Sequence, residues 1–216
     1  LPAGSSVAAA GIGAQGLDTP AIADAFAAAL GDGFPVVAVN DAALLVPAAG
    51  HDAGIGLISG TGAIGVGASV DGDPLITGGW GWVIGDEAGA AGIVREATRA
   101  ALLAHDDGAP DDGLISALLE AFAVEDAERL ARAVNDEPTM DNWGPRAPAV
   151  FAAAASGSSL AAAVVDGDAL HLARLVDQLI ARGAAGSVGV AAGGDHGRTG
   201  AVVDVGVAPR GGRGPA

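Results

Sequence analysis

The sequence of 216 residues contains no cysteine. Without thiols, the chain can form no disulfide bond, no thiolate metal site and no iron–sulfur cluster held by cysteine. Aromatic residues are also scarce, at 3%, although half of the residues are apolar and alanine dominates among them. Such a composition predicts a core of small side chains, in which helices and sheet pack closely together.

Lysine is absent too, so all ten basic residues are arginine, and the formal net charge is −16. So acidic a chain repels the phosphates of nucleic acids and of anionic membrane surfaces instead of neutralising them. A nucleotide can still bind where backbone N–H groups and a metal ion contact its phosphates. We therefore expect neither a nucleic-acid partner nor a membrane partner.

No segment is typical of a membrane span or of a targeting signal. The longest uncharged run, residues 147–165, is mostly alanine and is interrupted by Ser156-Gly157-Ser158-Ser159. A span needs about 20 strongly apolar residues. The N-terminal residues 1–17 have no basic region before their apolar stretch. We expect a soluble, cytoplasmic protein.

Residues 1–40 are expected to form a strand, a helix and a second strand. Residues 7–12 are an apolar run of strand length, and Pro35–Val39 form another. Between them, Thr19 and Pro20 are typical of a helix start. This order predicts two parallel strands connected by a helix, as in an α/β fold.

After residue 52 the pattern changes to consecutive strands and then to helices. Strands are expected at residues 54–59, 63–70, 74–77 and 188–192, and helices within 86–104, 111–122, 125–134 and 146–182. We place a boundary between two lobes near residue 52, so that residues 1–52 belong to the first lobe and 53–194 to the second. Residues 195–216, rich in Gly and Arg, are expected to be a disordered tail.

The first candidate feature is the loop Ser59-Gly60-Thr61-Gly62 between two expected strands. Two glycines let backbone N–H groups converge on phosphate oxygens, and the Thr61 hydroxyl is a further donor. Glycine-rich turns of this length are also common in plain hairpins. The loop alone therefore leaves a phosphate site and a structural turn both open.

The second feature is Gly78-Gly79-Trp80-Gly81-Trp82, followed by Gly85-Asp86-Glu87. A tryptophan between glycines has little local packing, so Trp80 either fills a core cavity or forms a platform beside a sugar. Asp86 either accepts hydrogen bonds from sugar hydroxyls or stabilises the N-terminus of the next helix.

The third feature is Asn40-Asp41, directly after an expected buried strand. In open α/β sheets, ligands collect at the carboxyl ends of strands. A carboxylate there can accept the proton of a hydroxyl that attacks a phosphoryl group. The alternative is that Asp41 only begins a short helix.

In their order and spacing these features resemble the N-acetylglucosamine kinases and the related bacterial glucosamine kinases. The resemblance rests on Val39-Asn40-Asp41-Ala42, Ile58-Ser59-Gly60-Thr61-Gly62, Gly78-Gly79-Trp80-Gly81 and Gly85-Asp86-Glu87, and it covers about residues 7–194. The group is also similar to the ATPase activators of acyl-CoA dehydratases, in the BadF/BadG/BcrA/BcrD type of ATPase. The resemblance implies a ribonuclease-H-like α/β fold of the actin/hexokinase ATPase type.

The implied activity is ATP-dependent phosphorylation of the 6-hydroxyl of an amino sugar, N-acetylglucosamine or glucosamine. The implied cofactors are ATP and Mg2+, and the implied assembly is a homodimer. Asp41 would be the catalytic base. The implied sugar-binding residues are Asn40, Gly79, Trp80, Gly81 and Asp86. The implied nucleotide-binding residues are Gly60, Thr61, Gly62, Gly193 and Gly194, and no side chain is assigned to a metal.

The sequence also departs from this family. The family begins with a glycine-rich hairpin of the Asp-x-Gly-Gly-Thr type, and nothing in residues 1–40 matches it. We therefore expect a chain truncated at both ends, with an incomplete N-terminal lobe and a larger C-terminal lobe. Two alternatives stay open. One is a non-catalytic protein that binds a sugar or a partner. The other, disfavoured by the absence of cysteine, is an activator ATPase of an acyl-CoA dehydratase.

Overall fold

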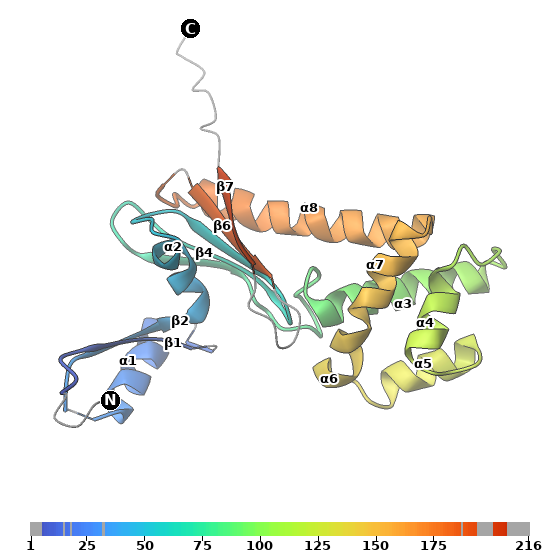
Figure 1. Cartoon of the computed structure of the whole chain (residues 1–216), viewed down its shortest axis with the longest axis horizontal. Helices are drawn as coiled ribbons and strands as arrows, with labels where there is room; N and C mark the ends of the chain where they lie inside the picture. The colour runs from blue at the N-terminus through green and yellow to red at the C-terminus, as the bar shows by residue number, and fades with distance from the viewer. Residues whose placement is uncertain are drawn as a thin grey trace, which may run out of the picture.

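The computed structural model describes residues 6–14, 16–17, 19–31, 33–186, 188–193 and 201–206. These residues form two separate β-sheets, of two and five strands, and a group of helices beyond the larger sheet (Figure 1).

The smaller sheet is a parallel strand-helix-strand unit, as the sequence predicts. β1 (Ala10–Ala14) pairs with β2 (Val36–Asn40), and α1 (Pro20–Ala29) connects them. Thr19 caps α1 through its side chain, as expected of a threonine before proline. The sequence predicted the first strand at residues 7–12, whereas β1 begins at Ala10, the first residue that pairs with β2.

The larger sheet has the strand order β5-β4-β3-β6-β7. Its strands are β3 (Ile55–Ser59), β4 (Ala63–Ala68), β5 (Pro74–Gly78), β6 (Val188–Gly193) and β7 (Ala201–Gly206). The first three form the predicted antiparallel meander, and β6 lies parallel to β3. Every strand of this sheet except β7 was expected from the sequence.

β7 corrects the expectation of a disordered tail over residues 195–216. Residues 201–206 pair antiparallel with β6, in register from Val188↔Gly206 to Gly193↔Ala201. The three β-branched residues Val202, Val203 and Val205 suit a strand. The remaining residues of that tail lie outside the described ones.

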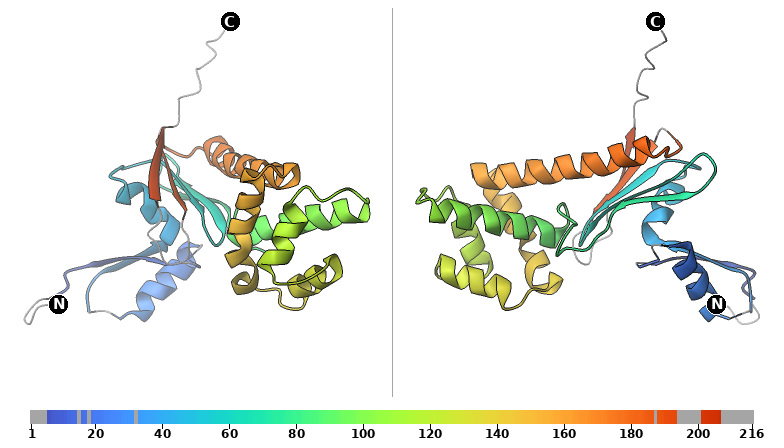
Figure 2. Two further views of the ribbon diagram at one scale, coloured as in Figure 1. Left: turned by 45° about the vertical axis from the view of Figure 1, so that its right-hand side comes forward. Right: turned by 180° about the vertical axis from the view of Figure 1, so that it is seen from behind.

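The helices between β5 and β6 are α3 (Ala90–Asp106), α4 (Leu114–Ala121), α5 (Ala127–Asn135), α6 (Met140–Trp143), α7 (Ala147–Ala155) and α8 (Ser159–Ala181). α8 packs against the larger sheet and also against α3, while α4 to α7 group beyond the end of the sheet (Figure 2). Their core contains two aromatic residues, Phe122 and Trp143, but consists mostly of small and aliphatic side chains, as the composition predicts, among them Ala91, Val94, Ala97, Leu114, Leu118, Leu130, Val150 and Ala161.

Two short helices connect the sheets. The 3-10 helix η1 (Asp41–Leu44) follows β2 and continues into α2 (Leu45–Ala48). η1 packs against β1 and β2 and also against β3 and β4. Asn40 is buried, and its Oδ1 atom accepts a hydrogen bond from Ala42 N at 3.0 Å. The residues that follow β2 therefore lie between the two sheets.

Among the described helices, none is by itself long and apolar enough to cross a membrane. Met140–Ala155 and Ser159–Ala181, bent by 117°, pass that test only as a pair, by length and composition.

Candidate functional site

Three segments that are separate in the sequence meet at one edge of the larger sheet. The loop 59–62 joins β3 to β4, and the pairing of β4 with β5 brings the end of β5 beside it. Gly79 N donates a hydrogen bond to Ala63 O at 2.9 Å, and Ala90 N donates one to Gly60 O at 2.8 Å. These bonds hold the end of β5 and the start of α3 against the same loop.

Asp86 lies in the turn before α3, with a φ of 53° and a side chain that is 9% exposed. A Cβ atom on Gly62 would lie 2.6 Å from Asp86 Oδ2, so any larger residue at position 62 would displace the carboxylate. The sequence predicted a helix within residues 86–104, but α3 begins at Ala90. The left-handed φ of Asp86 explains the later start, because a right-handed helix cannot include it. Asp86 is therefore not a first-turn residue of α3.

Asp86 is a hydrogen-bond acceptor held away from water. Its Oδ1 atom is buried and accepts no hydrogen bond from a described residue. Burial raises the pKa of Asp86 above its ordinary value, and the negative charge of Glu87 raises it further. The backbone N–H groups of Ala63 and Gly81 lower the pKa and so offset part of this increase. A ligand hydroxyl donating to Oδ1 would satisfy this atom.

Two further glycines allow the turn to approach the loop. A Cβ atom on Gly89 would lie 2.7 Å from the Cα of Gly62 and 2.8 Å from Thr61 O. One on Gly92 would lie 2.1 Å from Asp86 O. Both contacts are with backbone atoms, which cannot rotate away. The site is therefore built by close backbone packing.

The two tryptophans of the glycine-rich segment differ in their environment. Trp80 is 76% exposed, so it does not fill a core cavity. Trp82 packs against the helical core, with its ring centroid 4.9 Å from that of Trp143 at an interplanar angle of 72°. Of the two, Trp80 is the one free to contact a ligand.

Arg95, which no sequence pattern indicated, and Ser59, the first residue of the candidate loop, stabilise the loops of the site. Arg95 on α3 donates hydrogen bonds to the carbonyl oxygens of Trp82 and Gly85, the latter at 3.1 Å. Ser59 Oγ donates to Ala88 O at 2.8 Å. In the sequence, Arg95 resembles any surface arginine of a helix, so no pattern signals its role.

Asp41 is exposed at the junction of the two sheets. Its Oδ1 atom accepts a hydrogen bond from Ala42 N at 2.9 Å. A Cβ atom on Gly56 would lie 3.2 Å from Ala42 O, which places this turn beside Gly56, three residues before Ser59 on β3. The turn that follows Asp41 therefore lies beside β3, the strand that leads into the loop 59–62.

A cavity of about 450 Å³ adjoins this loop on the side of the helices. Its lining consists of Ser59, Gly60, Ala88, Ala90, Ile93, Gly144, Pro145, Ala147, Pro148 and Phe151. Because Ile58 pairs with Ala192, the end of β6 at Gly193 reaches the same edge of the sheet. Gly194 lies outside the described residues. A glycine-rich loop beside a largely apolar cavity suits a ligand with a phosphate and a flat ring system.

Protein side chains do not supply a metal site in the described part of the chain. No group of three or more His, Cys, Asp or Glu side chains there is arranged to hold a metal ion.

Residues 3–213 match the model of the BadF/BadG/BcrA/BcrD ATPase family. The chain belongs to this family. The match extends beyond the expected 7–194 at both ends, and it includes β7. Membership confirms the resemblance drawn from the motifs and implies the use of ATP.

Among solved structures, this chain is similar to a protein of Chromobacterium violaceum whose assignment as an N-acetylglucosamine kinase is itself provisional. The two are 29% identical, with a TM-score of 0.63, and the match covers 79% of this chain and 60% of that one. The mixed α/β architecture fits an actin/hexokinase-type ATPase fold. No functionally curated protein matches the chain.

Proposed function

We propose that this chain carries the sugar-binding and phosphate-binding residues of an ATP-dependent kinase. Its substrate is an amino sugar, N-acetylglucosamine or glucosamine, which it phosphorylates at the 6-hydroxyl. Support comes from the ATPase family, from the similar protein of Chromobacterium violaceum and from the geometry around Asp86. The match covers 60% of the length of that relative.

The buried carboxylate of Asp86 is the observation that carries the proposal. Its Oδ1 atom has no partner among the described residues, while Gly62 of the loop contacts Oδ2. A sugar hydroxyl donating to Oδ1 would lie next to a loop able to bind phosphate. Binding both substrates side by side is the main requirement of phosphoryl transfer.

The exposed aromatic face of Trp80 completes the proposed sugar site. Sugar rings present C–H groups on their faces, and these pack on the apolar face of an aromatic side chain. Trp80 lies between Gly79 and Gly81, which have φ angles of 70° and 86° and allow the tight turns around it. Asn40, buried at the end of β2, is proposed to position the neighbouring Asp41 for the sugar.

Asp41 is the proposed catalytic base. It accepts the proton of the 6-hydroxyl while that oxygen bonds to the terminal phosphorus of ATP and the bond to the ADP oxygen breaks. The products are the sugar 6-phosphate and ADP. Loop residues Gly60, Thr61 and Gly62, with Gly193 at the same sheet edge, bind the nucleotide. ATP supplies the phosphoryl group, and Mg2+ enters with its phosphates.

The test compares turnover in Asp41→Asn and in the control Asp24→Asn, which changes an exposed carboxylate on α1. Mass spectrometry of sugar phosphate formed from ATP and each amino sugar is the readout. We expect Asp41→Asn to lower turnover by about 10²-fold or more, as for loss of a general base. The control should leave turnover unchanged.

Near-normal turnover of Asp41→Asn would remove this residue from the role of base. A wild-type chain that binds the sugar without any turnover would instead favour the non-catalytic, sugar-binding alternative. Isothermal titration with the sugar alone, and then with ATP and Mg2+, separates these outcomes.

A further inference from the structure

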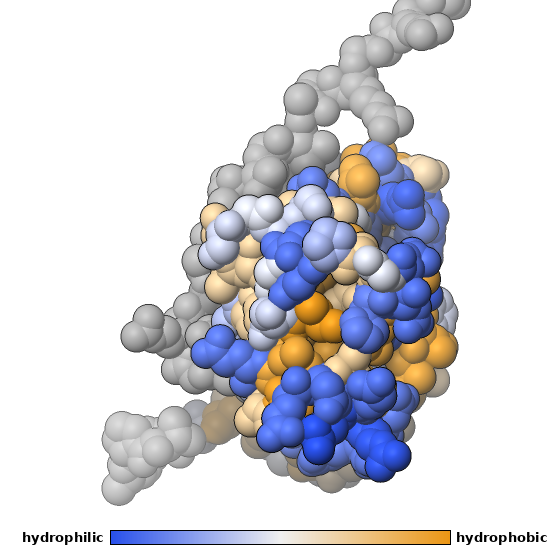
Figure 3. Space-filling view, turned by 90° about the vertical axis from the view of Figure 1, so that its right-hand side faces the viewer, coloured by the Kyte–Doolittle hydropathy of each residue, from blue (hydrophilic) through white to orange (hydrophobic). Residues whose placement is uncertain are grey.

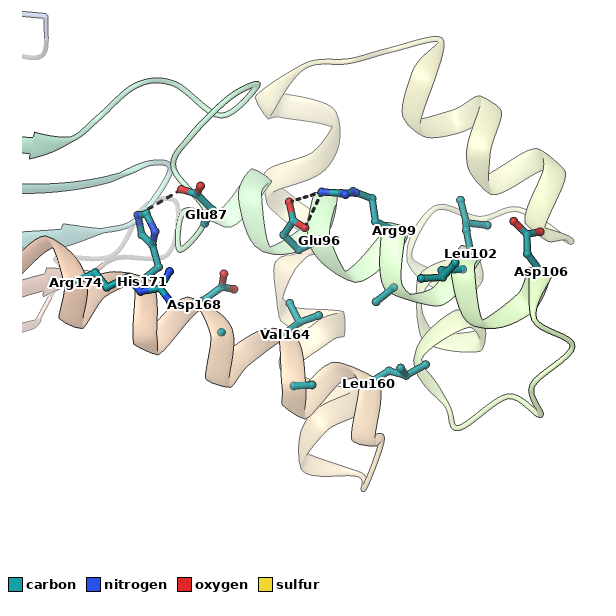
Figure 4. A pocket seen from close by; sticks show the side chains of 14 residues that line it. Glu87, Glu96, Arg99, Leu102, Asp106, Leu160, Val164, Asp168, His171 and Arg174 are labelled. Carbon is teal, nitrogen blue, oxygen red and sulfur yellow. Dashed lines mark hydrogen bonds and ion pairs between the residues drawn. The ribbon is translucent and has the colours of Figure 1, made fainter.

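A second hollow of the molecule lies between α3 and α8, with a volume of about 850 Å³. On the helical end of the molecule, apolar surface lies between hydrophilic margins (Figure 3). The close view shows side chains of α3 and α8 facing each other across the groove, with Glu87 at one end and Asp106 at the other (Figure 4). None of these side chains belongs to the proposed sugar and nucleotide sites.

Asp168 is the unusual residue of this groove. Only 7% of it is exposed, and its Oδ2 atom is buried without a hydrogen bond from any described residue. Its carboxylate points from α8 toward the loop that carries Glu87 (Figure 4). Burial raises the pKa of Asp168 to about 7, the nearby carboxylates of Glu96 and Glu87 add to this, and Arg95 opposes it. A buried carboxylate without a partner is costly, so a cationic group beside it would be stabilised.

The charges of the groove favour a cation. Four acidic residues line it, namely Glu87, Glu96, Asp106 and Asp168, against two arginines and one histidine. Arg99 already pairs with Glu96 at 3.1 Å. His171 Nε2 lies 3.3 Å from Glu87 Oε2 but is not aligned for a hydrogen bond. Neither contact satisfies Asp168.

The geometry of the groove suits an organic cation better than a metal ion. Metal ligands must converge to within about 2–2.6 Å of one centre. The described carboxylates and histidines nowhere form such a group of three. An ammonium group has three N–H donors and can contact carboxylates that are spaced further apart. The rest of the groove has an apolar wall, which includes Leu102, Leu160 and Val164.

We propose that the groove between α3 and α8 binds an aliphatic amine, with its ammonium group beside Asp168 and its methylene chain along the apolar wall. The site lies behind the turn that forms the sugar site, because Glu87 faces the groove while the adjacent Asp86 faces the loop 59–62. Amine binding needs neither ATP nor a sugar. Its test is therefore independent of the proposed kinase activity.

The experiment is isothermal titration at about pH 8, where Asp168 is mostly ionised. The probes are 1-aminobutane and 1,4-diaminobutane, and 1-butanol is the neutral control of equal length. We expect one-to-one, saturable binding of the amines and none of the alcohol. Asp168→Asn should weaken amine binding by about 10-fold or more, the usual loss for a charged hydrogen bond.

The matched control is Asp166→Asn, the same substitution on α8 at an exposed position outside the groove, and it should bind the amines as the wild type does. Circular dichroism verifies that each variant is folded. If Asp168→Asn does not fold, Glu87→Gln replaces it, with an expected weakening of about 3-fold or more. Equal binding of amine and alcohol, no amine binding at all, or unchanged affinity in the folded groove variant would each overturn the proposal.

Discussion

Asp86 and Asp168 are both buried carboxylates, 9% and 7% exposed, and each has one oxygen without a hydrogen bond among the described residues. Their surroundings differ. Backbone N–H groups and the glycines of the loop and turn surround Asp86. Asp168 lies between two helices, where its main neighbours are other carboxylates.

This difference separates a site built by backbone from a site built by side chains. Around Asp86, the positions of the acceptor and of the loop are fixed by contacts that allow no Cβ atom. Around Asp168, the two helix faces can accept substitutions without a change in the chain path. The first arrangement suits an exact pose of a reacting group, and the second suits a simple charge-recognition site.

The largest effect is expected from Gly92→Ala, which tests the backbone packing. Its Cβ atom would lie 2.1 Å from Asp86 O, so either the turn or α3 must move. We expect the free energy of unfolding to fall by about 3 kcal/mol, as in overpacked cores. Urea denaturation measures this change.

The matched control is Gly167→Ala on α8, where a Cβ atom meets nothing within 4 Å. Alanine is the better helix former, so this variant should gain up to about 1 kcal/mol. A loss of stability in Gly92→Ala together with a gain in Gly167→Ala would show that backbone packing, and not helix propensity, determines the effect at Gly92. An equal effect in both variants would show that Gly92 is only an ordinary helix residue.

A smaller effect, and one that depends on pH, is expected from Asp168→Asn. The pKa of Asp168 is raised to about 7 in the folded state, above its unfolded value. Stability from this residue is therefore present below the unfolded pKa, near 3.9, and is lost as the pH rises to about 7. The full shift corresponds to about 4 kcal/mol. Because solvent screens part of this charge effect, we expect the free energy of unfolding of the variant, which lacks the loss, to exceed that of the wild type by about 1–2 kcal/mol at pH 8.

Urea denaturation at about pH 4 and pH 8 measures this difference, which should nearly vanish at the lower pH. The other charged groups facing Asp168 are Glu87, Arg95, Glu96 and His171, so Asp166→Asn is the control for general charge effects. A variant that is less stable than the wild type at high pH would show that Asp168 has a stabilising partner.

The smallest effect concerns Trp80 and is spectroscopic. Because Trp80 is 76% exposed and Trp143 only 7%, Trp80 should account for most quenching of fluorescence by acrylamide. A bound amino sugar should cover part of the ring and reduce that quenching. Trp80→Phe should abolish the change, whereas unchanged quenching under confirmed sugar saturation would remove Trp80 from the site.

Much of the backbone-built site was predictable from the sequence. The sequence placed the loop 59–62 between two strands, and it lies there. The close packing of Gly89 and Gly92 on the turn was seen only in the structure. The exact start of α3 was not predictable, because nothing in the sequence marks the left-handed backbone conformation of Asp86.

The groove was not predictable at all. Asp166 and Asp168 are two residues apart on α8 in a similar local sequence, yet one is exposed and the other buried. Burial arises only where α3 meets α8, and these helices are far apart in the chain. β7 was missed for a similar reason, since its partner β6 determines that residues 201–206 form a strand.

The most direct test of the sugar site is a titration of two variants, Asp86→Asn and Asp168→Asn, with N-acetylglucosamine and glucosamine by isothermal calorimetry. We expect Asp86→Asn to weaken binding of the preferred sugar by about 10-fold or more, because a buried acceptor of its hydroxyls is altered. Asp168→Asn should bind that sugar as tightly as the wild type. Equal sugar affinity in all three proteins, or no binding of either sugar by the wild type, would contradict the assignment of Asp86 to an amino-sugar site.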